Sequence, residues 1–193
     1  MSKKRTLYRN AYVHTMNRGS RKEILFVDDF DRIQFLKYVN NAAQKSGDRV
    51  VSFCLMPNHY HILWRVYSQK SLPKTMQRIG TAYAMYFTRK YGLVGSVFQG
   101  RYYSVTAKSI AQRLTIMRYI HRNPSELAGW TCDYTDFPWS SHGLVMKRRD
   151  FSGVIDLAPY GVTRFFPDLE TFEKFVLENN KEAMQRLKEW DLG

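Results

Sequence analysis

The order in which strand-like and helix-like segments alternate is the feature of this sequence that most restricts its fold. Strand-like segments alternate apolar and polar residues or are rich in β-branched and aromatic residues, and helix-like segments repeat apolar residues every three or four positions. In chain order they are a strand at 8–16, a helix from Asp28 or Asp29 to Lys45, strands at 49–55 and 59–67, a helix over 72–87, a strand at 102–107 and a helix opening at Ser109. This order predicts an α+β fold, a ferredoxin-like βαββαβ arrangement with an antiparallel sheet, followed by one more helix.

Residues typical of helix ends support these boundaries. Asp28 or Asp29 can cap the first helix, and Gly47 can end it. Gly92 can end the second helix, and Ser109 with Gln112 has the spacing of a capping box at the start of the third. The apolar stripe predicted for the first helix consists of Phe30, Ile33, Leu36 and Val39.

The charge is unevenly distributed along the 193 residues, which carry a formal net charge of +13. Residues 167–193 hold seven acidic and four basic side chains, a net charge of −3, so residues 1–166 carry +16. A folded domain this basic suits a polyanionic partner, with nucleic acid first and an anionic membrane surface second.

A change in composition divides the chain into a body and an extension. Residues typical of a linker are Gly153, Pro159, Gly161 and Pro167. We therefore predict one basic domain over 1–150, and a linker with a C-terminal helical tail over 151–193. Apolar residues recur at helical spacing over 168–190, and this tail could brace the body or cover part of its basic surface.

No segment is typical of export or of insertion into a membrane. Apolar runs stay shorter than the roughly 18–20 residues that cross a bilayer, and the N-terminal residues lead into no secretory apolar stretch. We therefore expect a soluble, cytoplasmic protein that has no membrane partner. The two cysteines, Cys54 and Cys132, are expected to be reduced.

Two histidines stand two residues apart in a predicted strand. Side chains at this spacing point to the same face of a sheet, so His59 and His61 should project together, opposite Tyr60. Two imidazoles on one face can share a metal ion or one phosphate oxygen. The simpler interpretation is a pair of sheet histidines that face solvent.

The helix that opens at Ser109 carries a tyrosine away from its predicted apolar stripe. Ile110, Leu114, Met117 and His121 fall on one side, so we expect His121 to be a packing residue. Tyr119 lies opposite Ile110, and Asn123 lies one turn beyond Tyr119 on the same side. Tyr119 is therefore either a surface residue or a phenol positioned as a nucleophile.

Five motifs stand in order along the chain. They are Met16-Asn17-Arg18-Gly19, residues 55–63 with Met56-Pro57-Asn58-His59-Tyr60-His61 at the centre, Val97-Phe98-Gln99-Gly100-Arg101-Tyr102, residues 117–124 with Tyr119 and Asn123, and Phe137-Pro138-Trp139-Ser140-Ser141. Together they resemble the single-tyrosine HUH transposases, in particular the REP-associated tyrosine transposases and the insertion-sequence branch. The resemblance covers residues 8–145. It implies a ferredoxin-like domain that cleaves and rejoins single-stranded DNA, in a bacterial protein that associates with the nucleoid.

The resemblance implies a role for each residue of the site. His59 and His61 would bind a divalent ion, Mg²⁺ or Mn²⁺, and Asn123 stands where relatives carry a polar third ligand. Tyr119 would attack the phosphorus and form a 5′-phosphotyrosine bond, releasing a 3′-hydroxyl. The implied partner is single-stranded or hairpin DNA, and the implied assembly is a monomer or a homodimer.

DNA contacts are expected from residues in or near these motifs. Basic side chains can follow phosphates, and tyrosine rings can stack on unpaired bases. The residues assigned to this role are Asn17, Arg18, Arg21, Lys22, Arg101 and Tyr102.

Three other interpretations are compatible with parts of the sequence. A domesticated relative could bind DNA hairpins without transposing, with the same site residues. An RNA-binding module would need aromatic residues on the outward face of the central strands, where His59 and His61 stand instead. A zinc site would use Cys54, His59, His61 and Cys132, although the paired cysteine spacing of structural zinc sites is absent.

Overall fold

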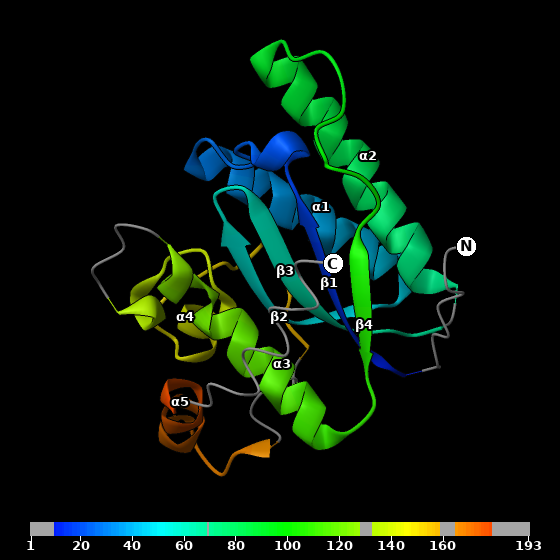
Figure 1. Ribbon diagram of the computed structural model, residues 1–193. Helices are drawn as coiled ribbons and strands as arrows, with labels where there is room; N and C mark the ends of the chain where they lie inside the picture. The colour runs from blue at the N-terminus through cyan, green and yellow to red at the C-terminus, as the bar shows by residue number, and fades with distance from the viewer. Residues whose placement is uncertain (1–9, 69, 128–132, 159–164, 179–193) are drawn as a thin grey trace.

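Four antiparallel strands form one sheet with the order β2-β3-β1-β4. The computed structural model describes residues 10–68, 70–127, 133–158 and 165–178 (Figure 1). The strands are β1 (Tyr12–Arg18), β2 (Arg49–Met56), β3 (His59–Arg65) and β4 (Tyr103–Ala107). With α1 (Asp29–Ser46) and α2 (Ser71–Tyr91) between them, they confirm the predicted ferredoxin-like βαββαβ order.

Helices cover both faces of the sheet. Figure 1 shows α1 and α2 behind it and α3 (Ile110–Arg122) in front. Two consecutive residues of β3 point to opposite faces of the sheet. The Tyr60 ring lies 4.7 Å from the Phe35 ring of α1, and the His61 ring lies 5.3 Å from the Tyr119 ring of α3. The predicted alternation of β3 is therefore confirmed, but neither face is open to solvent.

The helix ends are capped largely as predicted. Asp28 caps α1, and its side chain accepts a hydrogen bond from Asp31 N at 2.9 Å. Gly47 and Gly92 end α1 and α2 in the left-handed region, with φ of 73° and 63°. Ser109 caps α3, but the predicted capping box is incomplete there, because the Gln112 side chain accepts from Lys108 N instead of Ser109 N.

Phe30 was predicted for the buried stripe of α1, and this was wrong. Its side chain is 53% exposed, and Phe35 is buried against Tyr60 instead. The Phe30 ring instead lies at the surface against α2, 6.2 Å from the Tyr86 ring and 5.3 Å from Lys90 Nζ.

Short elements complete the described chain, and segments around Ser140 and Leu157 pair with the outer edge of β2. The short elements are η1 (Ser20–Lys22), η2 (Asn123–Glu126), η3 (Tyr134–Asp136), α4 (Ser141–Val145) and α5 (Leu169–Leu177). Leu55 N donates to Trp139 O at 2.9 Å, and Ala158 N donates to Val50 O at 2.7 Å. The backbone of β2, which would otherwise form a sheet edge, is thus paired in part with later segments.

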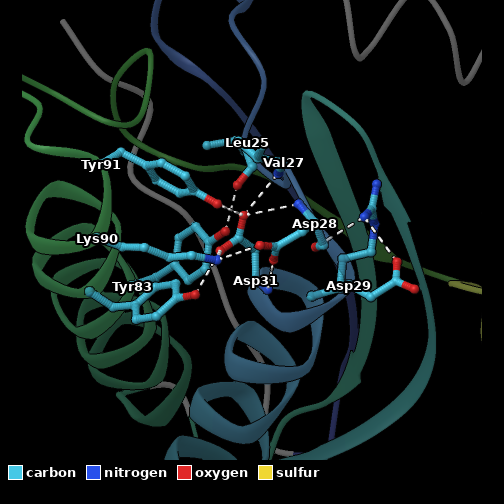
Figure 2. Close-up of polar contacts among 10 residues, drawn as sticks. Leu25, Val27, Asp28, Asp29, Asp31, Tyr83, Lys90 and Tyr91 are labelled. Atoms are coloured by element: carbon cyan, nitrogen blue, oxygen red, sulfur yellow. Dashed lines mark hydrogen bonds and ion pairs between the residues drawn. The ribbon is translucent and has the colours of Figure 1, made fainter.

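A buried carboxylate joins the start of α1 to the end of α2 (Figure 2). Asp31 has no exposed surface and accepts hydrogen bonds from Lys90 Nζ at 2.7 Å, Tyr86 Oη at 2.6 Å and Tyr91 Oη at 2.7 Å. Burial raises the pKa of Asp31, but these hydrogen bonds outweigh it and bring the pKa below the ordinary value of 3.8. Val27 N also donates to this carboxylate, so the network fixes the segment that leads from η1 into α1.

None of the helices in the described part of the chain has the length and apolar composition that a bilayer-spanning helix needs.

We predict that Asp31→Asn lowers the melting temperature at neutral pH by about 5 °C, because it replaces a buried anion to which three side chains and the backbone donate hydrogen bonds. A depressed carboxylate pKa stabilises the fold above the ordinary value of 3.8 and ceases to do so as the pH falls through the folded pKa. The difference between wild type and variant should therefore shrink in acid. Melting curves over a pH series test this, with the exposed Asp29→Asn as the control. A difference that does not depend on pH would contradict the role given to Asp31.

Candidate active site

The register between β1 and β3 brings polar side chains of both strands to the face that α3 covers. Arg18 lies opposite His59, and Met16 lies opposite His61. Residues two apart on β1 share this face, so His14 lies on it as well. His14 and His61 are almost completely buried, and His59 is half-buried.

His59 is held on both sides by amide groups. Its Nδ1 lies 2.7 Å from Asn58 Oδ1, and its Nε2 lies 3.1 Å from Asn123 Oδ1 at the end of α3. Asn58 is oriented in turn, because its Nδ2 donates to Lys22 O at 3.2 Å. Burial lowers the pKa of His59 to about 4, the Asn123 contact raises it, and the positive charge of Arg18 lowers it further. The ring is therefore neutral at pH 7 and carries one N–H.

The single N–H of His59 determines what its second nitrogen can bind. When Nδ1 donates to Asn58, the lone pair of Nε2 and that of Asn123 Oδ1 point into the same space. Such a pair of acceptors suits a bound cation, so the residues present fit a metal ion. Without a cation, rotation of the Asn123 amide would let its NH₂ group donate to Nε2.

His61 makes a similar contact with a histidine that sequence reasoning did not assign to the site. His14 Nε2 lies 3.0 Å from His61 Nδ1, and the two rings stack with centroids 5.2 Å apart. Burial lowers the pKa of His61 well below its ordinary value, and the charges of His59, His14 and Arg18 lower it further. Burial also lowers the pKa of His14 to about 4. The pairing depends on the register of β1 against β3, which the alternation within one strand does not reveal.

Tyr119 was predicted to lie outside the apolar stripe of its helix, and this was wrong. Its side chain is 3% exposed, and its ring meets the rings of His61 and His14 edge-on at 5.3 and 6.2 Å. Ile110, which was predicted to belong to the apolar stripe, is 53% exposed. The reason is that the C-terminal half of α3 lies between the sheet and α5, so residues on several sides of the helix are buried there.

The tail helix α5 holds the side of α3 that faces away from the sheet. Arg122 Nη1 donates to Leu177 O at 2.7 Å, and Arg118 forms an ion pair with Glu178 at 2.7 Å. Phe172 of α5 is fully buried and contacts His121 edge-on. The described contacts therefore favour a bracing role for the tail.

His121 is confirmed as a packing residue. It is fully buried, and its Nε2 lies 2.9 Å from Ser141 Oγ, which also accepts a hydrogen bond from Phe53 N. It thus connects α3 to α4 and to the edge of β2.

The residues assigned to DNA contacts fall into three places. Arg18 lies beside the histidines, and its charge lowers the pKa of both His59 and His61. Arg21 and Lys22 are exposed on η1, where both backbones adopt positive φ. A separate cavity of about 440 Å³ lies on the α2 side of the sheet, and its lining includes Asn17, Tyr60, Phe98, Arg101 and Tyr102.

The described residues do not support two of the other interpretations, a zinc site and an RNA-binding sheet surface. Within the described ranges, no group of three or more His, Cys, Asp or Glu side chains is arranged to hold a metal ion. Cys54 is fully buried and contacts the Met56 sulfur, as expected for a core residue, and Cys132 lies outside the described residues. An RNA-binding sheet surface would need an open face, and helices cover both.

A comparison with known proteins identifies the family of the chain. Residues 7–123 match the model of the family described as "Transposase IS200 like". The fold and the site define the class of the single-tyrosine HUH transposases. Because the match spans more than half of the chain, the protein belongs to the IS200-like transposase family.

One solved structure shows a similar fold. The chain is similar to the REP-associated tyrosine transposase bound to a REP hairpin, with 18% identity, a TM-score of 0.61 and coverage of 82% of this chain and 99% of that one. It is also similar, at 21% identity and a TM-score of 0.42, to a Deinococcus radiodurans protein assigned as a transposase, covering 62% of this chain and 95% of that one. No curated protein sequence matches the chain.

We predict that deletion of residues 167–193 lowers the melting temperature and weakens activity, because α3 loses the partner of its outer side. Phe172→Ala should reproduce the loss of stability, by about 3–5 kcal/mol, while it keeps every acidic residue of the tail. Glu170→Gln removes an exposed charge of the same helix and should change little. A truncated protein that melts like the full chain and binds DNA faster would instead show that the tail masks the DNA surface.

Proposed function

We propose that this protein cleaves and rejoins single-stranded, hairpin-flanked DNA through a phosphotyrosine bond at Tyr119. The observation that carries the proposal is the convergence on one site of two segments that are distant in the chain, β3 and the end of α3. His61 meets the Tyr119 ring at 5.3 Å, and His59 meets the Asn123 amide at 3.1 Å. A phenol next to two oriented imidazoles can act as a nucleophile toward a phosphodiester.

In the cleavage step, the Tyr119 hydroxyl oxygen attacks the phosphorus of the scissile phosphodiester. The bond from the tyrosine oxygen to phosphorus forms, and the bond from phosphorus to the 3′-oxygen breaks. The 3′-oxygen takes up a proton and leaves as a hydroxyl, and the phenol proton passes to solvent. The new bond is again a phosphodiester, so its energy is retained and rejoining a 3′-hydroxyl needs no ATP.

The residues that would hold a divalent cation are His59, His61 and Asn123. When bound, such an ion polarises the phosphoryl oxygens and offsets their charge in the transition state. Mg²⁺ prefers oxygen ligands, so two imidazoles and one amide suit Mn²⁺ at least as well.

Residues of the chain itself orient this site and add positive charge to it. Asn58 holds the ring of His59 through Nδ1, so Nε2 is directed toward Asn123. Arg18 is close enough to both histidines to lower their pKa, so its guanidinium can offset charge on a phosphate bound there.

The proposed partner is hairpin DNA with an unpaired flank, as in the similar transposase that was solved with a REP hairpin. Residues 1–166 carry a net charge of +16, which favours binding to phosphates. Arg21 and Lys22 are exposed next to Asn58 and could contact the backbone. The cavity lined by Asn17, Arg101 and Tyr102 could accept an unpaired base.

We predict that Tyr119→Phe abolishes the covalent protein–DNA adduct and leaves hairpin affinity within about threefold, because only the hydroxyl is removed and the ring still packs on His61. Denaturing gels after incubation with single-stranded hairpin DNA and Mn²⁺ detect the adduct, and a binding titration gives the affinity. Tyr38→Phe is the matched control, because Tyr38 lies on α1 against Tyr86 of α2, on the other side of the sheet, and should retain the adduct. An adduct of normal yield in Tyr119→Phe would remove Tyr119 from this role. Hairpin binding by the wild type without any adduct would favour a domesticated binding protein.

We predict that His59→Ala weakens Mn²⁺ affinity by more than about tenfold, because the incomplete ligand set loses an imidazole. Asn123→Ala should cause a smaller loss, since water can replace one amide oxygen. Isothermal titration calorimetry measures both, and His142→Ala serves as the control, because His142 is a buried histidine of α4 outside this site. Equal Mn²⁺ affinity in wild type and His59→Ala would disprove the metal assignment.

A further inference from the structure

His14 is a buried histidine for which the phosphotyrosine chemistry needs no role. It is 2% exposed and lies at the centre of β1, and its Nε2 lies 3.0 Å from His61 Nδ1. At this distance one ring must donate a proton and the other must accept it. Its ring also meets Tyr119 edge-on at 6.2 Å, so His14 contacts both the proposed ligand and the proposed nucleophile.

The direction of this hydrogen bond determines whether His61 can bind a cation. A neutral imidazole carries its proton on one nitrogen only. If His14 donated to His61 Nδ1, the His61 proton would be on Nε2 and would block that nitrogen. If His61 Nδ1 donates to His14, the lone pair of His61 Nε2 is available.

The neighbouring histidine is arranged in a similar way. His59 has its Nδ1 next to Asn58 Oδ1, which can only accept, so its Nε2 is the nitrogen left to bind. In each ring, then, Nδ1 contacts a buried or oriented group of the chain, and in His59 the opposite nitrogen, Nε2, lies 3.1 Å from Asn123 Oδ1. Metal-binding histidines commonly use such a second contact to fix the tautomer and the ring orientation.

We propose that His14 is a positioning residue that accepts a hydrogen bond from His61 Nδ1 and so holds His61 in the tautomer whose Nε2 can bind a divalent cation. This inference rests on the proposed function. By its edge contact with Tyr119, the same ring keeps the phenol next to His61. His14 itself does not touch the cation or the DNA.

The tautomer can be measured directly in the metal-free wild-type protein. Long-range ¹H–¹⁵N correlation spectra of ¹⁵N-histidine-labelled protein distinguish a protonated Nδ1 from a protonated Nε2, and His61→Gln assigns the signals. We expect His61 to carry its proton on Nδ1 and His14 to carry its proton on the nitrogen that does not face His61. A proton on His61 Nε2 would overturn the proposal.

Variants then separate positioning from packing. His14→Leu removes the acceptor, and we expect Mn²⁺ affinity to fall by about 10- to 100-fold in calorimetry. His14→Gln can place its Oε1 near the position of the lost Nε2, so it should restore most of the affinity. The matched control is Thr15→Val, which removes a buried hydrogen bond to Trp64 on the opposite face of the same strand.

The Mn²⁺ affinities of the three variants together test the proposal. Loss in His14→Leu with rescue in His14→Gln and no loss in Thr15→Val supports the proposal. Unchanged Mn²⁺ affinity in His14→Leu overturns it, and so do equal losses in all three variants, which would indicate a packing effect. Failure of the metal assignment itself would appear separately, as unchanged affinity in His59→Ala. If His14→Leu does not fold, the tautomer of His61 measured in the wild-type protein still tests the proposal.

Discussion

The antiparallel register between β1 and β3 is the constraint on which the rest of the site depends. It places Arg18 opposite His59 and Met16 opposite His61, and it brings His14 within 3.0 Å of His61. Because the side chains of a strand alternate, a shift by one residue would turn every one of these groups to the opposite face. The backbone hydrogen bonds between β1 and β3 therefore determine which side chains meet in the site, as well as the fold of the sheet.

The second requirement is a rigid position for α3. The sheet contacts one side of this helix and α5 the other, so Tyr119 and Asn123 face the histidines while Arg118 and Arg122 face the tail. Rigid elements hold reacting groups more accurately than loops do. The tail thus stabilises the helix that carries the proposed nucleophile.

Local patterns predicted much of the fold, because they depend on neighbours within one element. Alternation placed His59 and His61 on one face, and the order of segments predicted the ferredoxin-like sheet, which the structure confirms. Contacts between elements were not predictable in this way. The role of His14 needs the register of two strands, and the burial of Tyr119 needs α5 on the outer side of α3. A prediction from helical spacing assumes that one side of the helix is buried, whereas α3 is buried on two sides.

The central claim is that His59 and His61 hold one divalent cation beside Tyr119. Pulsed electron paramagnetic resonance of Mn²⁺ added to ¹⁵N-histidine-labelled protein measures this most directly, because hyperfine couplings report the nitrogens bound to the ion. Our account predicts couplings from two imidazole nitrogens on one Mn²⁺, with one of them lost in His59→Ala. A spectrum of Mn²⁺ with oxygen ligands alone would contradict it.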